Sequence, residues 1–400
     1  MSYSGGNEDR LTSLPEEVIS HILSLMPTKF AVQTSILSKR WRYCWMTVTN
    51  LDFDDRKPFN GLDCFSKFVD RVLNLCKTSK LKSFRLNFFR YPVPLSSVLK
   101  WIDKAVELKV CELLINVRLF ELPLRLFTCK TLTKLSLASW TDYDIQGFVV
   151  PSLVILPALK TLDITVKSEY NSVNAFRLIH GCPVLESLSL VTISRDCEDY
   201  NFNIPTLKRL EITTNTVPLR TNKVFLKLPN LEYLFVGGNL VSHFVMEDLS
   251  SLVEATVSLI HVRKNLSLPK FPNLTRLELK GLCSGWLLAI QFLETSSTLE
   301  HFCIEEPNES YWIEPQRVPT CMLSKLITMK ITRCKGRECD IRFLEYMLRN
   351  AEVLKTLTIT CGILRMKDEM ALCARLLKFP RASRYCEIHF VGKWLNSTGN

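Results

Sequence analysis

The sequence predicts an α/β fold in which a short all-helical head precedes a solenoid of stacked coils. Two observations support this prediction. A loose L-x-x-L-x-L pattern occurs twelve times, and successive copies start 21 to 29 residues apart. Residues 9–50 stand outside that repeat and carry apolar residues at helical spacing instead. One strand plus one return segment every 20 to 29 residues or so is the period of a leucine-rich solenoid.

The head is predicted to begin with two helices. Residues 13–16 read Ser-Leu-Pro-Glu, which is typical of a capping box with proline in the first helical turn. Residues 26–29, Met-Pro-Thr-Lys, break that helix, and a second helical stretch is expected over residues 30–36. Apolar residues in the head recur at helical spacing: Val18, Ile19, Ile22, Leu23, Leu25 and Met26, then Leu37, Trp41, Cys44 and Trp45.

The apolar content of the head leaves two interpretations open. A segment this short cannot bury all these side chains within itself. It either packs on the solenoid as an N-terminal cap or docks on the helices of a partner. The spacing of the residues does not decide between the two.

Each copy of the repeat is expected to form one strand. Its last three residues alternate apolar, polar, apolar, which is the period of a strand with one buried face. A single strand cannot bury its leucines, so stability must come from stacking. Five copies have a proline two residues before the first apolar residue, where it ends the return segment. The twelve copies start at Leu81, Val110, Leu132, Leu159, Leu185, Leu207, Leu231, Leu252, Leta274 is not a residue of this chain.

 The previous sentence is garbled, and the full set of starts is Leu81, Val110, Leu132, Leu159, Leu185, Leu207, Leu231, Leu252, Leu274, Leu299, Leu326 and Leu354.

The composition argues against several classes of protein. The apolar share of 47% supports a large core, and the 15 cysteines follow neither a disulfide framework nor a zinc-ligand spacing. The first ten residues are polar and acidic, unlike a secretory signal, and no apolar run approaches the ~18 residues of a membrane helix. We therefore expect no membrane association and a reducing compartment, the cytoplasm or the nucleus.

The net charge of +11 is concentrated near the end of the chain, because residues 321–400 hold 15 basic and 7 acidic side chains. Such an excess favours an acidic partner or nucleic acid, although it is more often a solvated surface. The outward positions of the predicted strands carry six charges of each sign, which makes nucleic acid or an anionic cofactor in that groove an unlikely ligand. Aromatic residues occur there in one copy only, as Tyr233 and Phe235, and these are the candidate target-binding residues.

No catalytic or metal site is predicted. The six histidines lie in no metal-ligand spacing and accompany no nucleophile motif, and the pair Gly237-Gly238 lacks the surroundings of a phosphate loop. We therefore expect no cofactor, no metal and no enzymatic activity in this chain.

Two segments resemble known families. The head resembles the F-box, and residues near the end resemble the FBD segment of plant F-box/leucine-rich-repeat proteins. The F-box resemblance rests on Leu14-Pro15, Ile22-Leu23, Met26-Pro27-Thr28-Lys29, Leu37-Ser38-Lys39-Arg40-Trp41-Arg42 and Trp45. The FBD resemblance rests on Trp312, Pro315, Val318-Pro319, Cys321, Leu323, the run from Phe343 to Ala351 and the run from Leu377 to Ser383.

The resemblance implies a function and a division of the chain. F-box proteins are the substrate-recognition subunits of SCF (Skp–cullin–F-box) ubiquitin ligases, whose catalysis comes from partners. Residues 9–55 would be the F-box, 56–310 a leucine-rich-repeat horseshoe, and 311–391 an FBD-like segment that completes the solenoid. The repeats would bind an unknown protein target. The residues implied to bind the Skp-type adaptor, and through it a cullin, are Leu14, Pro15, Val18, Ile22, Leu23, Ile36, Leu37 and Trp41.

Two alternatives to this function remain. The chain would act as an F-box scaffold outside a ligase if it bound the adaptor without a cullin. It would be a basic solenoid associated with nucleic acid if the charged C-terminal region bound DNA or RNA.

Overall fold

The computed structural model divides into two compact units, Met1–Leu185 and Glu186–Asn400, which are described separately below. It describes residues 14–56, 62–88, 93–117, 121–138, 149–166, 172–192, 199–214, 223–238, 243–259, 268–281, 285–306 and 312–395.

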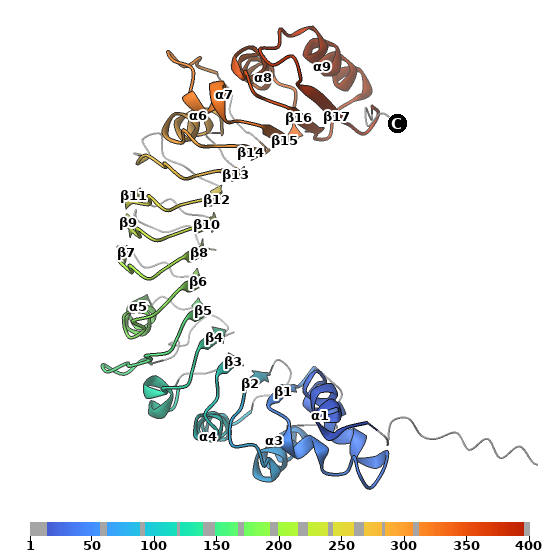
Figure 1. The fold of residues 1–400 in the computed structure, drawn as a ribbon, viewed down its shortest axis with the longest axis vertical. Coiled ribbons are helices and arrows are strands. Elements are labelled where there is room, and N and C mark those ends of the chain that lie inside the picture. The colour runs from blue at the N-terminus through green and yellow to red at the C-terminus, as the bar shows by residue number, and fades with distance from the viewer. Residues whose placement is uncertain are drawn as a thin grey trace, which may run out of the picture. The chain divides into compact units, whose positions relative to one another are not determined.

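The N-terminal unit begins with the head and continues as a parallel sheet. The head contains α1 (Glu16–Ser24), α2 (Thr28–Gln33) and the 3-10 turns η1 (Thr34–Ile36) and η2 (Cys44–Thr47). The strands follow in the order β1 (Asn50–Asp54), β2 (Ser83–Asn87), β3 (Glu112–Asn116), β4 (Lys134–Ala138) and β5 (Thr161–Val166). The return segments carry α3 (Leu62–Leu75), α4 (Leu95–Glu107), η3 (Leu124–Thr128) and α5 (Ser172–His180) (Figure 1).

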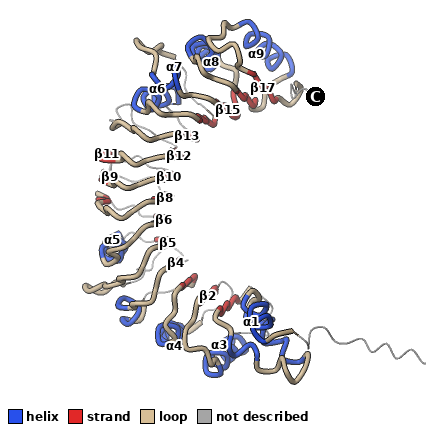
Figure 2. The backbone as a smooth tube through the Cα atoms, in the orientation of Figure 1, coloured by secondary structure: helices blue, strands red, loops and turns tan. Residues whose placement is uncertain are grey.

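The C-terminal unit is a longer parallel sheet with a second, smaller sheet in its return segments. The main sheet contains β6 (Ser187–Thr192), β8 (Arg209–Thr214), β10 (Tyr233–Gly238), β12 (Glu254–Leu259), β13 (Arg276–Lys280), β14 (His301–Glu305), β15 (Thr328–Cys334), β16 (Thr356–Cys361) and β17 (Glu387–Val391). The small sheet contains β7 (Tyr200–Phe202), β9 (Lys223–Lys227) and β11 (His243–Asp248). Figure 2 shows helices in the later returns, namely α6 (Gly285–Thr295), α7 (Thr320–Ser324), α8 (Glu338–Asn350) and α9 (Met366–Lys378).

Both sheets keep the apolar residues of the repeat in register. Leu210 lies opposite Leu234, which lies opposite Ala255, and Phe84 lies opposite Leu113 in the other unit. Because the side-chain period of a strand is two, this register places one face of every coil in the core. The first apolar residue of each of the twelve copies is buried, with an exposed fraction of at most 1%.

The structure confirms the twelve predicted strands and adds others. Each predicted copy supplies one strand, beginning two residues after its first apolar residue. Strands β1 and β17 extend the sheets and were not predicted, nor was the small sheet of β7, β9 and β11. In the head, α1 begins at Glu16 with Pro15 as its N-cap, and the predicted cap Ser13 lies outside the described residues. The helical spacing after Leu37 was misleading, because residues 39–43 form turns.

Candidate functional site

The head has its own small core. Ile19 and Leu23 of α1 are fully buried, and Trp41 and Trp45 are nearly so. Ile19 and Leu23 lie four residues apart and therefore share one face of the helix. The tryptophans come from the turns that return the chain to β1. This core fixes α1 against η2 and leaves the opposite side of the helix outside.

Polar contacts tie the head to the first strand. The Thr28 hydroxyl, which is buried, accepts the Asp52 backbone N–H at 2.7 Å. The Asn50 side-chain amide donates to the Ser24 carbonyl at 3.1 Å. The head therefore lies against β1 as a cap, one of the two arrangements that the sequence left open.

An apolar surface nevertheless remains on the head. The exposed fraction is 40% for Val18, 37% for Ile22, 86% for Ile36 and 58% for Leu37. Pro15 is exposed and Leu14 is half-buried. We call Val18, Ile22, Ile36 and Leu37 the head patch. The exposed apolar residues that sequence reasoning did not assign to the adaptor are Leu25, Phe30 and Tyr43.

Two of the predicted adaptor residues lie elsewhere. Leu23 is fully buried and Trp41 is 4% exposed, so both belong to the core of the head. Neither has surface to offer a partner in this structure. Their role in adaptor binding, if the head docks as it stands, is to hold the head patch in place.

The candidate target-binding aromatics lie on the outward face of β10. Tyr233 and Phe235 are both half-buried. The Arg209 guanidinium carbon lies 3.6 Å from the centre of the Tyr233 ring, a cation–π contact across neighbouring strands. The Phe235 ring lies over Gly237, where an added Cβ would come within 2.8 Å of the ring. Glycine therefore makes room for this ring.

The charges on the strand faces are paired with one another. In the C-terminal unit, Arg209 and Glu211 lie 2.6 Å apart and Lys280 and Glu278 lie 3.1 Å apart. In the N-terminal unit, Lys134 lies 3.9 Å from Asp163. The alternation of sign expected from the sequence is therefore realised as ion pairs, which reduces the field that a polyanion would sense.

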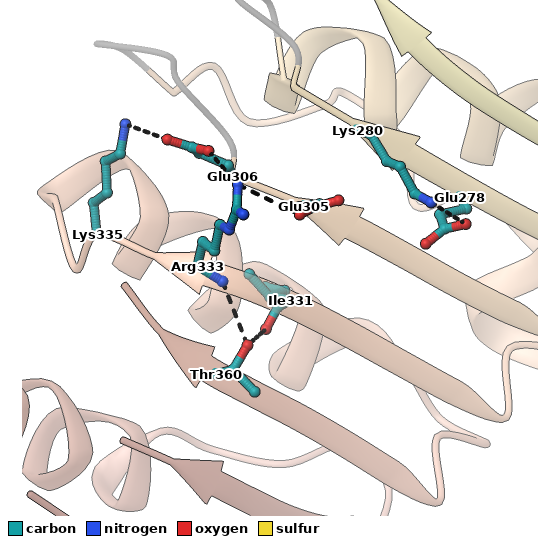
Figure 3. Close-up of polar contacts among 8 residues, drawn as sticks. All are labelled: Glu278, Lys280, Glu305, Glu306, Ile331, Arg333, Lys335 and Thr360. Atoms are coloured by element: carbon teal, nitrogen blue, oxygen red, sulfur yellow. Dashed lines mark hydrogen bonds and ion pairs between the residues drawn. The ribbon is translucent and has the colours of Figure 1, made fainter. Parts of the chain in front are cut away.

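A second polar cluster lies where β14 and β15 end (Figure 3). Arg333 lies 3.0 Å from Glu306 and 3.6 Å from Glu305, and Lys335 lies 3.4 Å from Glu306. The hydrogen bond from Arg333 lowers the pKa of Glu306, with a further contribution from Lys335. Glu306 and Arg333 both have positive φ, 49° and 54°, a conformation that costs energy for residues with a side chain. These ion pairs cross-link the turns of adjacent coils.

Nothing among the described residues resembles a metal site: no group of three or more His, Cys, Asp or Glu side chains there could hold an ion. The ring of His301 contacts the Thr328 hydroxyl at 2.8 Å, and His261 lies outside the described residues. In the same part of the chain, no helix is long and apolar enough to cross a membrane.

Three stretches of the chain match known families. Residues 11–52 match the F-box domain, which covers the whole head patch. Residues 99–247 match the LRR repeats of FBD-associated F-box protein At5g56370, and residues 314–359 match FBD.

Full-length relatives decide the family. FBD-associated F-box protein At4g10400 from Arabidopsis thaliana is 31% identical, over 96% of this chain and 100% of its own length. The chain belongs to the F-box/FBD/LRR-repeat proteins. F-box/FBD/LRR-repeat protein At4g26340 is 30% identical over 96% of this chain and all of its own length. F-box/LRR-repeat protein At3g59200 is 38% identical over 63% of this chain and half of its own length. Both of these relatives are also from Arabidopsis thaliana.

The F-box/FBD/LRR assignment relates the surfaces to the matched segments. The head patch lies within the F-box match, and Tyr233 and Phe235 lie within the repeat match. Helix α9 and strand β17 follow the end of the FBD match. The boundaries predicted at residues 55, 310 and 391 stay predictions.

Proposed function

We propose that this F-box/FBD/LRR protein is the substrate-recognition subunit of an SCF-type ubiquitin ligase. The head docks on a Skp-type adaptor, which links it to a cullin, and the repeats bind a protein target. Partners supply the catalysis. The observation that carries the proposal is the head patch, because it stays exposed while the core of the same F-box is filled by other residues.

The chemistry of the head patch suits a helical partner. Burying an aliphatic side chain contributes about 1.5 to 3 kcal/mol, so four such residues can anchor an interface. Val18 and Ile22 lie four residues apart and form one row on α1, while Ile36 and Leu37 extend the patch from η1. Pro15 and Leu14, at the start of α1, remain part of the proposed adaptor surface.

The proposed target surface is the outward face of the strands. We infer that the repeats form a leucine-rich-repeat horseshoe, supported by the in-register parallel strands of each unit. Tyr233, Phe235 and Arg209 then offer aromatic and guanidinium groups of the kind that dominate interfaces. The paired charges of the strand faces favour a protein target over a polyanion.

The proposed location is the cytoplasm or the nucleus. Every cysteine in the described part of the chain is free, which supports a reducing compartment.

Binding to a purified Skp-type adaptor tests the proposal. The double variant Ile36→Asp/Leu37→Asp should weaken binding about a hundredfold, because losing interface anchors costs about 2 to 4 kcal/mol. The matched control is Ile363→Asp in the C-terminal unit, where the exposed fraction is 105%. It makes the same substitution at an exposed isoleucine and should bind normally. Isothermal titration calorimetry measures both affinities.

A second double variant probes the start of α1. Leu14→Ala/Pro15→Ala should also abolish adaptor binding while the coils stay folded, as judged by circular dichroism. Wild-type affinity in both double variants would refute the docking assignment. Adaptor binding without cullin recruitment would instead indicate a scaffold outside the ligase.

A further inference from the structure

Helix α9 exposes a row of apolar side chains. The exposed fraction is 54% for Met366, 49% for Met370 and 65% for Leu377, and Cys373 is half-buried between them. These four positions follow i, i+4, i+7 and i+11 and therefore lie along one flank of the helix. We call Met366, Met370 and Leu377 the α9 stripe.

The α9 stripe lies on the flank away from α8. Leu372 and Leu376 face the core, and Arg375 pairs with Glu338 of α8 at 2.8 Å. With 3.6 residues per turn, the stripe falls on the other flank, where one more coil would stack. Terminal coils of repeat proteins normally carry a polar outer face, which this flank lacks.

The neighbouring strand is open on the same side. Among the described strands, β17 pairs with β16 alone, so its far edge carries unpaired backbone groups. The order α8, α9 follows the order β15, β16, β17, so the stripe and the open edge belong to one end face. Unpaired backbone groups are costly in lipid, which favours a protein over a membrane as the occupant.

The charge of the end face is positive. Its carboxylates are engaged, since Asp368 pairs with Arg365 at 2.7 Å and Glu369 accepts backbone N–H groups. Lys367, Lys378 and Arg384 are exposed and have no ion pair within the described part of the chain. A second copy of this chain would bring the same cations to the contact, whereas an acidic partner would neutralise them.

We propose that the end face binds an acidic amphipathic segment of another protein, with the α9 stripe as its apolar contact and Lys367, Lys378 and Arg384 as its charged rim. This surface is separate from the head patch and from Tyr233 and Phe235, and it does not depend on adaptor docking. It gives the chain a binding site beyond its proposed adaptor and target surfaces.

Two synthetic helical peptides of about 18 residues test the proposal. Both carry leucines at the spacing of the stripe, and the remaining positions are glutamate in one and lysine in the other. In fluorescence anisotropy with the full chain, the glutamate peptide should bind about tenfold more tightly than the lysine peptide, and added salt should narrow the difference. Lys367→Glu/Lys378→Glu should reverse the preference, and Met370→Glu should abolish binding.

Leu124→Glu in the N-terminal unit is the control, because Leu124 is an apolar residue of comparable exposure outside the end face. This variant should bind like the wild type. The proposal is overturned if neither peptide binds, if both bind equally, or if Met370→Glu binds normally. It is also overturned if Met370→Glu abolishes a dimer seen by sedimentation or binding to phosphatidylserine vesicles, which would assign the face to a second copy or to a membrane.

Discussion

At the residue scale, burial determines what the thiols can do. Burial raises the pKa of Cys182 to about 12, and its Sγ donates to the Leu178 carbonyl at 3.1 Å. Burial likewise raises the pKa of Cys321 to about 12. Thiolates are the reactive form of cysteine, so both side chains behave as small apolar residues of the core.

The thiols should therefore differ in reactivity. At pH 8, a thiol with a pKa of about 12 is ionised in about one molecule in ten thousand, so maleimide should modify Cys182 and Cys321 only after unfolding. Raising the pH to 9 should leave both protected, since it remains far below their pKa. Cys64, which is exposed on α3, should react in the native protein. Mass spectrometry of labelled peptides checks this, and equal labelling of Cys182 and Cys64 would contradict it.

Adjacent residues of the head show where sequence reasoning stops. Ile22 and Leu23 both fit apolar helical rows, yet Ile22 lies on the surface and Leu23 in the core. The two rows differ only in which one faces Trp41 and Trp45, and those residues come from turns that helical spacing does not describe. The existence of an apolar surface was predictable, but its membership was not.

At the element scale, a buried carboxylate fixes the end of the described chain against α9. Glu369 is fully buried and accepts the backbone N–H groups of Lys393, Trp394 and Leu395 at 3.1, 3.0 and 2.6 Å. These charge-assisted bonds compensate for the burial of the carboxylate. The turn after β17 is thereby held against the helix.

Gly392 makes that close approach possible. A Cβ built there would lie 1.8 Å from a Glu369 carboxylate oxygen. Gly392→Ala should therefore lower the free energy of unfolding of the last coil by about 2 to 3 kcal/mol, as overpacking does. Hydrogen exchange of the α9 amides measures the effect. Gly362→Ala is the control, since its Cβ would meet its nearest neighbour, the Arg333 carbonyl, at 3.4 Å. A similar loss in both variants would argue against this role of Gly392.

The strands of the repeat were predictable because one local rule sets them. Twelve copies of the pattern gave twelve strands, each with its first apolar residue buried. Strand β1 escaped because its copy reads Val-Thr-Asn-Leu-Asp-Phe at residues 48–53, without a leading leucine. The small sheet escaped because its strands lie in the returns, where only short alternations such as Val224 and Leu226 mark them.

At the scale of the whole molecule, the account separates binding surfaces along the chain. The head patch serves the adaptor, the strand face of β8 and β10 serves a target, and the end face serves an acidic partner. Each surface lies within one of the two units, so none requires a particular placement of one unit against the other.

The head has a double role in this account. It caps β1 through Thr28 and Asn50, and it keeps its outer apolar residues exposed. The two interpretations left open by the sequence therefore describe two sides of the same segment.

Hydrogen exchange of the full chain, with and without a purified Skp-type adaptor, tests the central claim most directly. The account predicts that the adaptor slows exchange in residues 16–37 of the head and leaves β8, β10 and β12 unchanged. The absence of a complex, or slower exchange in those strands with none in the head, would contradict it.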